Sequence, residues 1–146
     1  MGYTHYWTPK RSDEKKFKEY SNTCSKLKNS LPDRIKIGDG GGYLSDINKI
    51  KPTFSKDEVI FNGFGELAHE TFHIGLNQND WDFCKTACKP YDLLVCSCLL
   101  AAVDILGYKI SSDGTVKDWI PALEFYNKYV KGANFTEEKL SKELNR

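Results

Sequence analysis

The sequence lacks a long run of apolar residues and lacks an excess of charge of either sign. Its longest apolar stretch, residues 93–106, is interrupted by Ser97 and Asp104 and falls short of the roughly 18–20 residues that a membrane-spanning helix requires. Lys and Arg total 21 against 20 Asp and Glu, for a net charge of +1. Nonspecific binding to nucleic acid needs a large basic excess. We therefore expect neither a membrane protein nor a protein that binds long nucleic acids.

Internal repeats, low-complexity linkers and a signal-like start, with a basic segment before an apolar one, are also missing. The 146 residues match the usual size of one domain, and an aromatic content of 13% is enough to build a core. We expect a single domain over residues 1–146, located in the cytoplasm. The five cysteines are an odd number, which favours reduced and mostly buried thiols. The oligomeric state stays open.

The apolar pattern predicts a mixed fold. Strands are expected at residues 3–8, 34–37, 59–61, 70–74, 81–86 and 108–111. Helices are expected at residues 12–29, 91–106, 116–130 and 136–144, with Ser12 and Thr136 as N-terminal caps. The helix over 91–106 is apolar on nearly all sides, so it should be buried. The predicted fold class is α+β, with a small, mainly antiparallel central sheet, one buried helix and two to three flanking amphipathic helices.

The sharpest chemical motif is His69-Glu70-Thr71-Phe72-His73, which has the H-E-x-x-H pattern of zinc hydrolases. On a helix, His69 and His73 would lie one turn apart and bind zinc, with Glu70 as the general base. The composition of Thr71 to Ile74 is nevertheless typical of a strand. On a strand the two histidines would lie about 13 Å apart, too far to share an ion. A zinc-dependent hydrolase is kept as an alternative.

A second candidate site is the junction between a strand and the apolar helix, at residues 83–92. Such a junction offers free backbone amides and the positive end of the helix dipole. Lys85, Thr86, Lys89 and Tyr91 would complete a cradle for an anionic ligand such as a phosphate. The plainer interpretation is a helix start with two solvated lysines.

The first predicted strand is rich in aromatic residues. On a strand, Tyr3, His5 and Trp7 share one face, which would either stack a base or sugar or fill the core. His5 is the member of this face that can act as an acid or a base. The glycine run over residues 38–42 matches neither common phosphate-loop pattern and is interpreted as a flexible loop.

Several short stretches carry a resemblance to a known group of proteins. They are residues 1–7 (MGYTHYW), 83–86 (FCKT) with 89–92 (KPYD), 61–63 (FNG), 70–72 (ETF) and, more loosely, Trp119 and Ala122. In these stretches the chain resembles a widespread family of small, largely uncharacterised bacteriophage and prophage proteins. The resemblance implies a viral protein in the host cytosol, and small phage proteins often counter host defences. It assigns no activity to any residue.

These observations support three hypotheses. In the first, Tyr3, Trp7, Lys85, Thr86, Lys89 and Tyr91 form a pocket for a small anion, such as a nucleotide or cyclic nucleotide that the protein sequesters or cleaves to counter host defence. If cleavage occurs, His5 is the expected acid or base, and no cofactor is needed. The second is the zinc hydrolase. The third is a protein that blocks a host partner through an exposed aromatic patch. Whether the protein is an enzyme stays open.

Overall fold

The computed structural model describes residues 3–39 and 50–144. Its strands are β1 (Thr4–Thr8), β2 (Ile37–Gly38), β3 (Thr53–Phe54), β4 (Glu58–Gly63), β5 (Phe72–Gly75), β6 (Asp82–Lys85) and β7 (Lys109–Ser112). Its helices are α1 (Glu14–Asn29), α2 (Asp92–Ala101), α3 (Val116–Tyr129) and α4 (Glu137–Leu144). The α+β class with antiparallel pairing is confirmed. No helix among the described residues is both long enough and apolar enough to cross a membrane.

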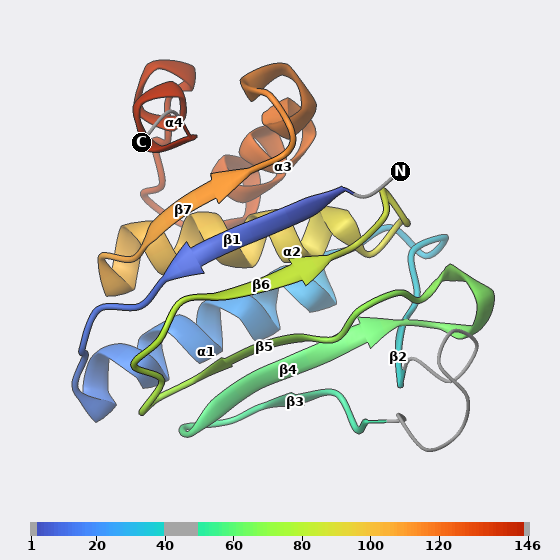
Figure 1. The fold of residues 1–146 in the computed structure, drawn as a ribbon, viewed down its shortest axis with the longest axis horizontal. Coiled ribbons are helices and arrows are strands. Elements are labelled where there is room, and N and C mark those ends of the chain that lie inside the picture. Colours follow the sequence, from blue (N-terminus) through green and yellow to red (C-terminus); the bar gives the residue numbers. More distant parts are fainter. Residues whose placement is uncertain (1–2, 40–49, 145–146) are drawn as a thin grey trace.

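β1 lies between β6 and β7 and pairs antiparallel with both. The other strands gather around β4, which pairs with β2, β3 and β5. The two sets of strands meet where the Glu70 amide donates to the Lys85 carbonyl (3.1 Å) and the Lys85 amide donates to the Glu70 carboxylate (2.7 Å). In Figure 1 the strands therefore lie side by side in the order β7, β1, β6, β5, β4 and β3.

Two helices cover one face of these strands. Figure 1 shows α1 and α2 behind the strands and α3 and α4 beyond β7, while no helix crosses the near face. α1 turns Phe17, Tyr20, Cys24 and Leu27 inward at helical spacing, as predicted. Every residue of α2 from Leu94 to Ala101 is buried. The prediction of a buried central helix is thus confirmed.

The ends of the helices follow local capping chemistry. Asp13, not Ser12, caps α1, because its carboxylate accepts from the amide of Lys16 at 2.7 Å. Thr136 caps α4 as predicted, accepting from the amide of Lys139 at 3.0 Å. The long apolar helix does end at Gly107, whose φ of 72° is left-handed. Its last five residues, 102–106, form a π-helical turn.

Other sequence predictions need correction. The second predicted strand is displaced to β2, and β3 lies in a segment for which no strand is predicted. An Asn-Gly pair commonly marks a turn, but Asn62 and Gly63 do not form one. They belong to β4, and the chain turns after them, at a 3-10 turn over Gly65–Leu67. Asn62 supports this turn by donating to the carbonyl of His69 and accepting from its amide. Gly38 belongs to β2, whereas residues 40–42 of the glycine run lie outside the described residues.

Candidate functional site

The candidate site is built around His5, which lies on the central strand β1 and is fully buried. Its Nδ1 atom lies 2.7 Å from the Ser112 hydroxyl on β7, and its Nε2 atom lies 2.7 Å from Asp92 Oδ1 on α2. Tyr3 and Trp119 pack edge-on against the imidazole, with ring centroids 4.9 and 5.1 Å away. The histidine therefore joins a strand, a helix and two aromatic rings in one fixed position.

The neighbours of Ser112 decide which nitrogen of His5 carries the proton. The Ser112 hydroxyl oxygen accepts from the indole N–H of Trp119 at 3.1 Å and from the amide of Gly114 at 2.9 Å. A hydroxyl oxygen has two acceptor positions and one proton. Since both acceptor positions are in use, the proton of Ser112 points to His5 Nδ1. Nδ1 is therefore an acceptor, and Nε2 carries the proton that is donated to Asp92.

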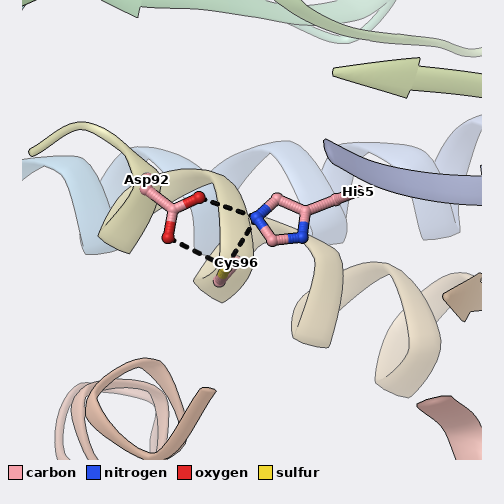
Figure 2. Close-up of side chains that lie close together, drawn as sticks. All are labelled: His5, Asp92 and Cys96. Atoms are coloured by element: carbon pink, nitrogen blue, oxygen red, sulfur yellow. Dashed lines mark hydrogen bonds and ion pairs between the residues drawn. The ribbon is translucent and has the colours of Figure 1, made fainter. Parts of the chain in front are cut away.

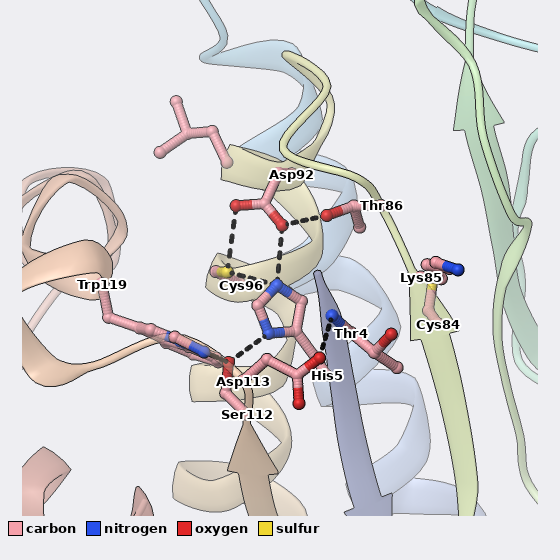
Figure 3. A network of polar contacts seen from close by, with 12 residues as sticks. Thr4, His5, Cys84, Lys85, Thr86, Asp92, Cys96, Ser112, Asp113 and Trp119 are labelled. Carbon is pink, nitrogen blue, oxygen red and sulfur yellow. Dashed lines mark hydrogen bonds and ion pairs between the residues drawn. The ribbon is translucent and has the colours of Figure 1, made fainter. Parts of the chain in front are cut away.

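Asp92 reaches solvent, with 21% of its side chain exposed. Its Oδ1 atom accepts from His5 and also from the hydroxyl of Thr86, at 2.5 Å. The thiol of Cys96 lies 3.6 Å from Oδ2 and 3.4 Å from His5 Nε2. Figure 3 shows how these contacts continue through Ser112 to Trp119. The carboxylate is thus held by two strong donors on one oxygen and by a weak thiol contact on the other.

His5, Asp92 and Cys96 resemble a metal site at first sight, because one ligand atom from each lies within 4.8 Å of the others. Figure 2 shows the three side chains pointing toward one another. Zinc accepts nitrogen, oxygen and sulfur ligands of these kinds. A metal on Nε2, however, would move the ring proton to Nδ1, which would then have to donate to Ser112. Both acceptor positions of Ser112 are already occupied, so the surroundings of Ser112 favour the hydrogen-bonded network over a bound metal ion.

Cys96 is also unsuited to act as a nucleophile. Burial raises the pKa of its thiol well above the ordinary value, and the negative charge of Asp92 raises it further. A nucleophilic cysteine needs the opposite, a lowered pKa that yields thiolate. Moreover, Nε2 of His5 directs its proton toward Asp92, so His5 offers no lone pair to accept the thiol proton.

A cavity of about 390 Å³ opens above Asp92 and Cys96. It lies between the start of β1, the start of α2 and the first turns of α3. The side chains that line it and carry charge or reactive groups are Tyr3, Arg34, Cys88, Lys89, Asp92, Cys96 and Asp118. Within residues 3–39 and 50–144, neither Arg34 nor Lys89 forms an ion pair. The cavity therefore has two cations without an ion-pair partner in these ranges, the carboxylate of Asp92 at its floor, and a second carboxylate, Asp118, at its exposed edge.

The loop that places Lys89 is conformationally unusual. Ala87 and Cys88 both have left-handed backbones, with φ of 52° and 59°. Non-glycine residues adopt this conformation at a cost of order 1 kcal/mol or more, and such positions cluster at functional sites. The amides of Thr86 and Ala87 donate to the Tyr3 carbonyl, at 3.1 and 3.3 Å, which fixes the loop to β1. This anchoring brings Tyr3 and Lys89 to the same cavity.

A second cavity, of about 550 Å³, is lined by residues of α1 and α3 and by Asp104 of the π-helical turn. Asp104 already accepts from the Tyr126 hydroxyl at 3.0 Å and pairs with Lys139 at 3.3 Å. The lysines that line this cavity, such as Lys16 and Lys26, are exposed surface residues. The buried polar residue of this lining, Tyr126, already uses its hydroxyl on Asp104, so this cavity is the weaker candidate.

The structure separates the predicted ligand residues into two groups. Tyr3 and Lys89 line the cavity. Trp7 and Tyr91 belong to the core, with 1% and 0% of their surface exposed, so their prediction as ligand residues is wrong. Aromatic periodicity cannot distinguish a core ring from one that lines a pocket.

The remaining predicted residues act indirectly or lie elsewhere. Thr86 is buried and supports Asp92. Lys85 lies on β6, is absent from the cavity lining, and points away from Asp92 in Figure 3. His5 has no exposed surface, so the prediction that it touches a ligand as acid or base is corrected to a supporting role beneath Asp92.

The H-E-x-x-H segment is not a helix. β5 begins at Phe72, and His73 pairs with Glu58 of β4 at 3.0 Å. His69 Nδ1 lies 2.7 Å from the Lys85 carbonyl, and the Glu70 carboxylate accepts from the Lys85 amide. The strand-like composition of this segment gave the better prediction. The prediction that His69 and His73 lie one helical turn apart, as a zinc site would need, is wrong.

Sequence reasoning missed three functional residues, Arg34, Ser112 and Asp118, and did not single out the role of Asp92. Arg34 and Asp118 line the cavity from segments far apart in the sequence. Ser112 lies just past the strand predicted over residues 108–111, in an expected turn, where its sequence context indicates no partner. Only Asp92 had a usable signal, because an acidic residue in the first turn of a buried helix is held near the core.

Comparison of the chain with protein-family models, with curated proteins and with solved structures finds no match in any of the three.

Proposed function

We propose that this protein binds a small anionic molecule of the nucleotide class in the cavity between β1, α2 and α3. The observation that carries the proposal is the convergence of Arg34 and Lys89 on one cavity without an ion-pair partner among the described residues. Lys89 is half-buried, and a cation in such a position gains most from an anionic ligand. Guanidinium and ammonium groups are the usual partners of phosphate.

The size and lining of the cavity agree with a small ligand. A volume of about 390 Å³ falls within the usual range of roughly 300–1,000 Å³ for small-molecule sites. Tyr3 offers an aromatic ring at the rim, where a base could pack. A long nucleic acid would instead need an extended basic surface, which the net charge of +1 does not favour.

Binding, rather than catalysis, is the activity that these side chains support. His5 is buried with both nitrogens engaged, and burial keeps the Cys96 thiol protonated. Sequestration requires only affinity, which the charged rim can provide. The resemblance to small phage proteins suggests a host signalling nucleotide as the target, and this identification remains a prediction.

Thermal-shift and calorimetric titrations with nucleoside monophosphates, cyclic nucleotides and inorganic phosphate test the proposal. A ligand that binds the folded state raises the melting temperature. Replacing Lys89 by Gln should weaken nucleotide binding about 10-fold or more, since a charge-assisted hydrogen bond is worth about 1.5–3 kcal/mol. Lys142→Gln is the matched control, because Lys142 is exposed on α4. No shift with any nucleotide at millimolar concentration would refute the proposal.

A second candidate, binding of a protein partner, is favoured by one observation on the open face of the strands. Trp81 and Phe83 are 62% and 45% exposed and pack against each other, and Phe83 also contacts Tyr6 of β1. Exposed aromatic clusters of this kind are common at protein interfaces. This function would be supported if the wild type and Lys89→Gln retain a partner from host extract. The double variant Trp81→Ser, Phe83→Ser should then fail to retain it. Equal retention by the double variant would exclude the aromatic face.

A further inference from the structure

We infer that the ligand of this cavity is a phosphorylated sugar, free or within a nucleotide, and that one of its hydroxyl groups donates a hydrogen bond to Asp92 Oδ2. The inference rests on the proposed function, because it names the class of ligand for the same cavity. It depends on the unequal surroundings of the two oxygens of Asp92.

The first oxygen, Oδ1, is fully engaged within the protein. It accepts from His5 Nε2 at 2.7 Å and from the Thr86 hydroxyl at 2.5 Å. Both donors are completely buried. Their short distances are typical of strong hydrogen bonds to a carboxylate. Oδ1 therefore fixes the orientation of the side chain and is not available to a ligand.

The second oxygen, Oδ2, has spare acceptor capacity. Its contact within the described part of the chain is the Cys96 thiol at 3.6 Å, and a thiol is a weak donor. Asp92 lines the cavity and keeps 21% of its side chain exposed. An ionised carboxylate accepts hydrogen bonds and donates none. A ligand group that contacts Oδ2 must therefore carry an N–H or O–H.

The orientation of Asp92 is set by a chain of hydrogen bonds that all run toward it. Trp119 and Gly114 donate to Ser112, Ser112 donates to His5, and His5 donates to Asp92. Figure 3 shows this chain extending from α3 across the end of β7 to α2. A side chain held in this way loses little rotamer freedom when a ligand binds, which favours recognition of a defined donor.

The rim and the floor of the cavity together set the ligand class. Arg34 and Lys89 provide positive charge for a phosphate, and Asp92 provides an acceptor in the same cavity. Inorganic phosphate satisfies only the cations, and it places an anion near the Asp92 carboxylate. A sugar phosphate satisfies both, because its hydroxyl groups donate, and carboxylates commonly recognise ribose hydroxyls. The second carboxylate, Asp118, lies at the exposed edge of the cavity.

The variant Asp92→Asn isolates the role of Oδ2. Its amide oxygen can keep accepting from His5 and Thr86, while its NH2 group replaces Oδ2 with a donor. The probes are inorganic phosphate, ribose 5-phosphate, adenosine 5′-monophosphate and 2′-deoxyadenosine 5′-monophosphate, measured by calorimetry. For the wild type we expect at least 10-fold tighter binding of ribose 5-phosphate than of phosphate. For Asp92→Asn we expect a loss of 10-fold or more toward ribose 5-phosphate, with phosphate binding unchanged or tighter.

The outcomes separate this inference from the proposed function. If Asp92→Asn binds ribose 5-phosphate like the wild type while Lys89→Gln loses it, the inference is overturned and the anion site stands. If the wild type binds none of the four probes, both are overturned. Weaker binding of the deoxynucleotide than of the ribonucleotide would support contact with the 2′-hydroxyl. An unchanged melting temperature shows that Asp92→Asn remains folded, and Asp113→Asn is a control at an exposed carboxylate outside the cavity.

Discussion

Ser112 donates its hydroxyl proton to Nδ1 of His5 across 2.7 Å, although 107 positions separate the two residues in the sequence. The direction of this bond follows from the two N–H groups, from Trp119 and Gly114, that already occupy the acceptor positions of Ser112. This contact makes His5 a donor to Asp92. A residue that sequence patterns nominate as an acid or base thus becomes part of the support for a carboxylate.

The first prediction concerns the position of the proton on His5. Long-range ¹⁵N–¹H correlation spectra at neutral pH should show the proton on Nε2 and none on Nδ1. Replacing Ser112 by Ala removes the donor to Nδ1, but the proton should stay on Nε2, because the Asp92 carboxylate accepts and cannot donate. A wild-type spectrum with the proton on Nδ1, or one-to-one zinc binding that is lost in His5→Gln, would contradict the hydrogen-bond directions given above.

The second prediction concerns stability. Replacing His5 by Ala should lower the free energy of unfolding by about 3 kcal/mol, because it removes two buried hydrogen bonds and the packing against two rings. Replacing His73 by Ala should change it by at most about 0.5 kcal/mol, because the His73–Glu58 pair is roughly half exposed. Urea denaturation of both variants provides the comparison. A loss in His5→Ala as small as that expected for His73→Ala would show that the His5 network adds no stability.

Much of the fold could be predicted because the local signals were complete. Alternation marked β1, helical spacing of apolar residues marked α1, and Gly107 marked the end of the long apolar helix. β3 could not be predicted, since Thr53–Phe54 is only two residues long and cannot show a period. An Asn-Gly pair commonly marks a turn, but Asn62 and Gly63 extend β4, because Asn62 contacts His69 after the chain turns.

The candidate site could be predicted only in part. His5 and the segment around Lys89 were identified because histidine and strand-to-helix junctions carry chemistry wherever they occur. Arg34, Ser112 and Asp118 were not identified, because their roles depend on segments that become neighbours only in the folded chain. Local patterns locate reactive groups, whereas the distinction between lining a cavity and supporting it requires tertiary contacts.

The third prediction concerns alkaline pH. Burial raises the pKa of the Cys84, Cys96 and Cys98 thiols above the ordinary value of 9.0, and it raises the pKa of Tyr108 to about 12 from 10.0. Above pH 9 the unfolded chain therefore loses protons that the folded chain retains. Stability is fully present below that pH and should fall as pH rises, by up to about 1.4 kcal/mol per pH unit for each thiol.

Urea unfolding between pH 7 and 10.5 measures this dependence. The free energy of unfolding should be nearly constant to about pH 8 and then fall ever more steeply. Cys98→Ala removes one of the thiols and should give a shallower slope above pH 9. A stability that stays constant up to pH 10.5 would mean that the buried thiols ionise as readily in the folded protein as in the unfolded chain.

The fourth prediction concerns thiol reactivity. Cys88 is exposed in the loop at the cavity, whereas the other four cysteines have at most 2% of their surface exposed. An aromatic disulfide reagent should therefore modify one thiol quickly, and Cys88→Ser should abolish that reaction. Partial desolvation raises the pKa of the Cys88 thiol, and the negative charges of Asp92 and Asp118 raise it further. The reaction of Cys88 at pH 7 should therefore be slower than that of a free thiol.

The same reagent reports on the cavity. A ligand bound beside Lys89 should slow the modification of Cys88, because both residues line the same space. Rapid modification of several thiols would show that the core opens on the timescale of the reaction. Modification of Cys88 at the same rate with and without a saturating ligand would place that ligand elsewhere.

The central position of β1 has a consequence for synthesis on the ribosome. The nascent chain exposes this aromatic strand before either of its neighbours, because β6 ends at residue 85 and β7 at residue 112. Until both have left the exit tunnel, β1 lacks its two neighbours, and His5 lacks Ser112. The carboxylate of Asp92 therefore acquires its final orientation only after residue 112 has left the tunnel. Chaperones that shield aromatic segments would meet this chain during that interval.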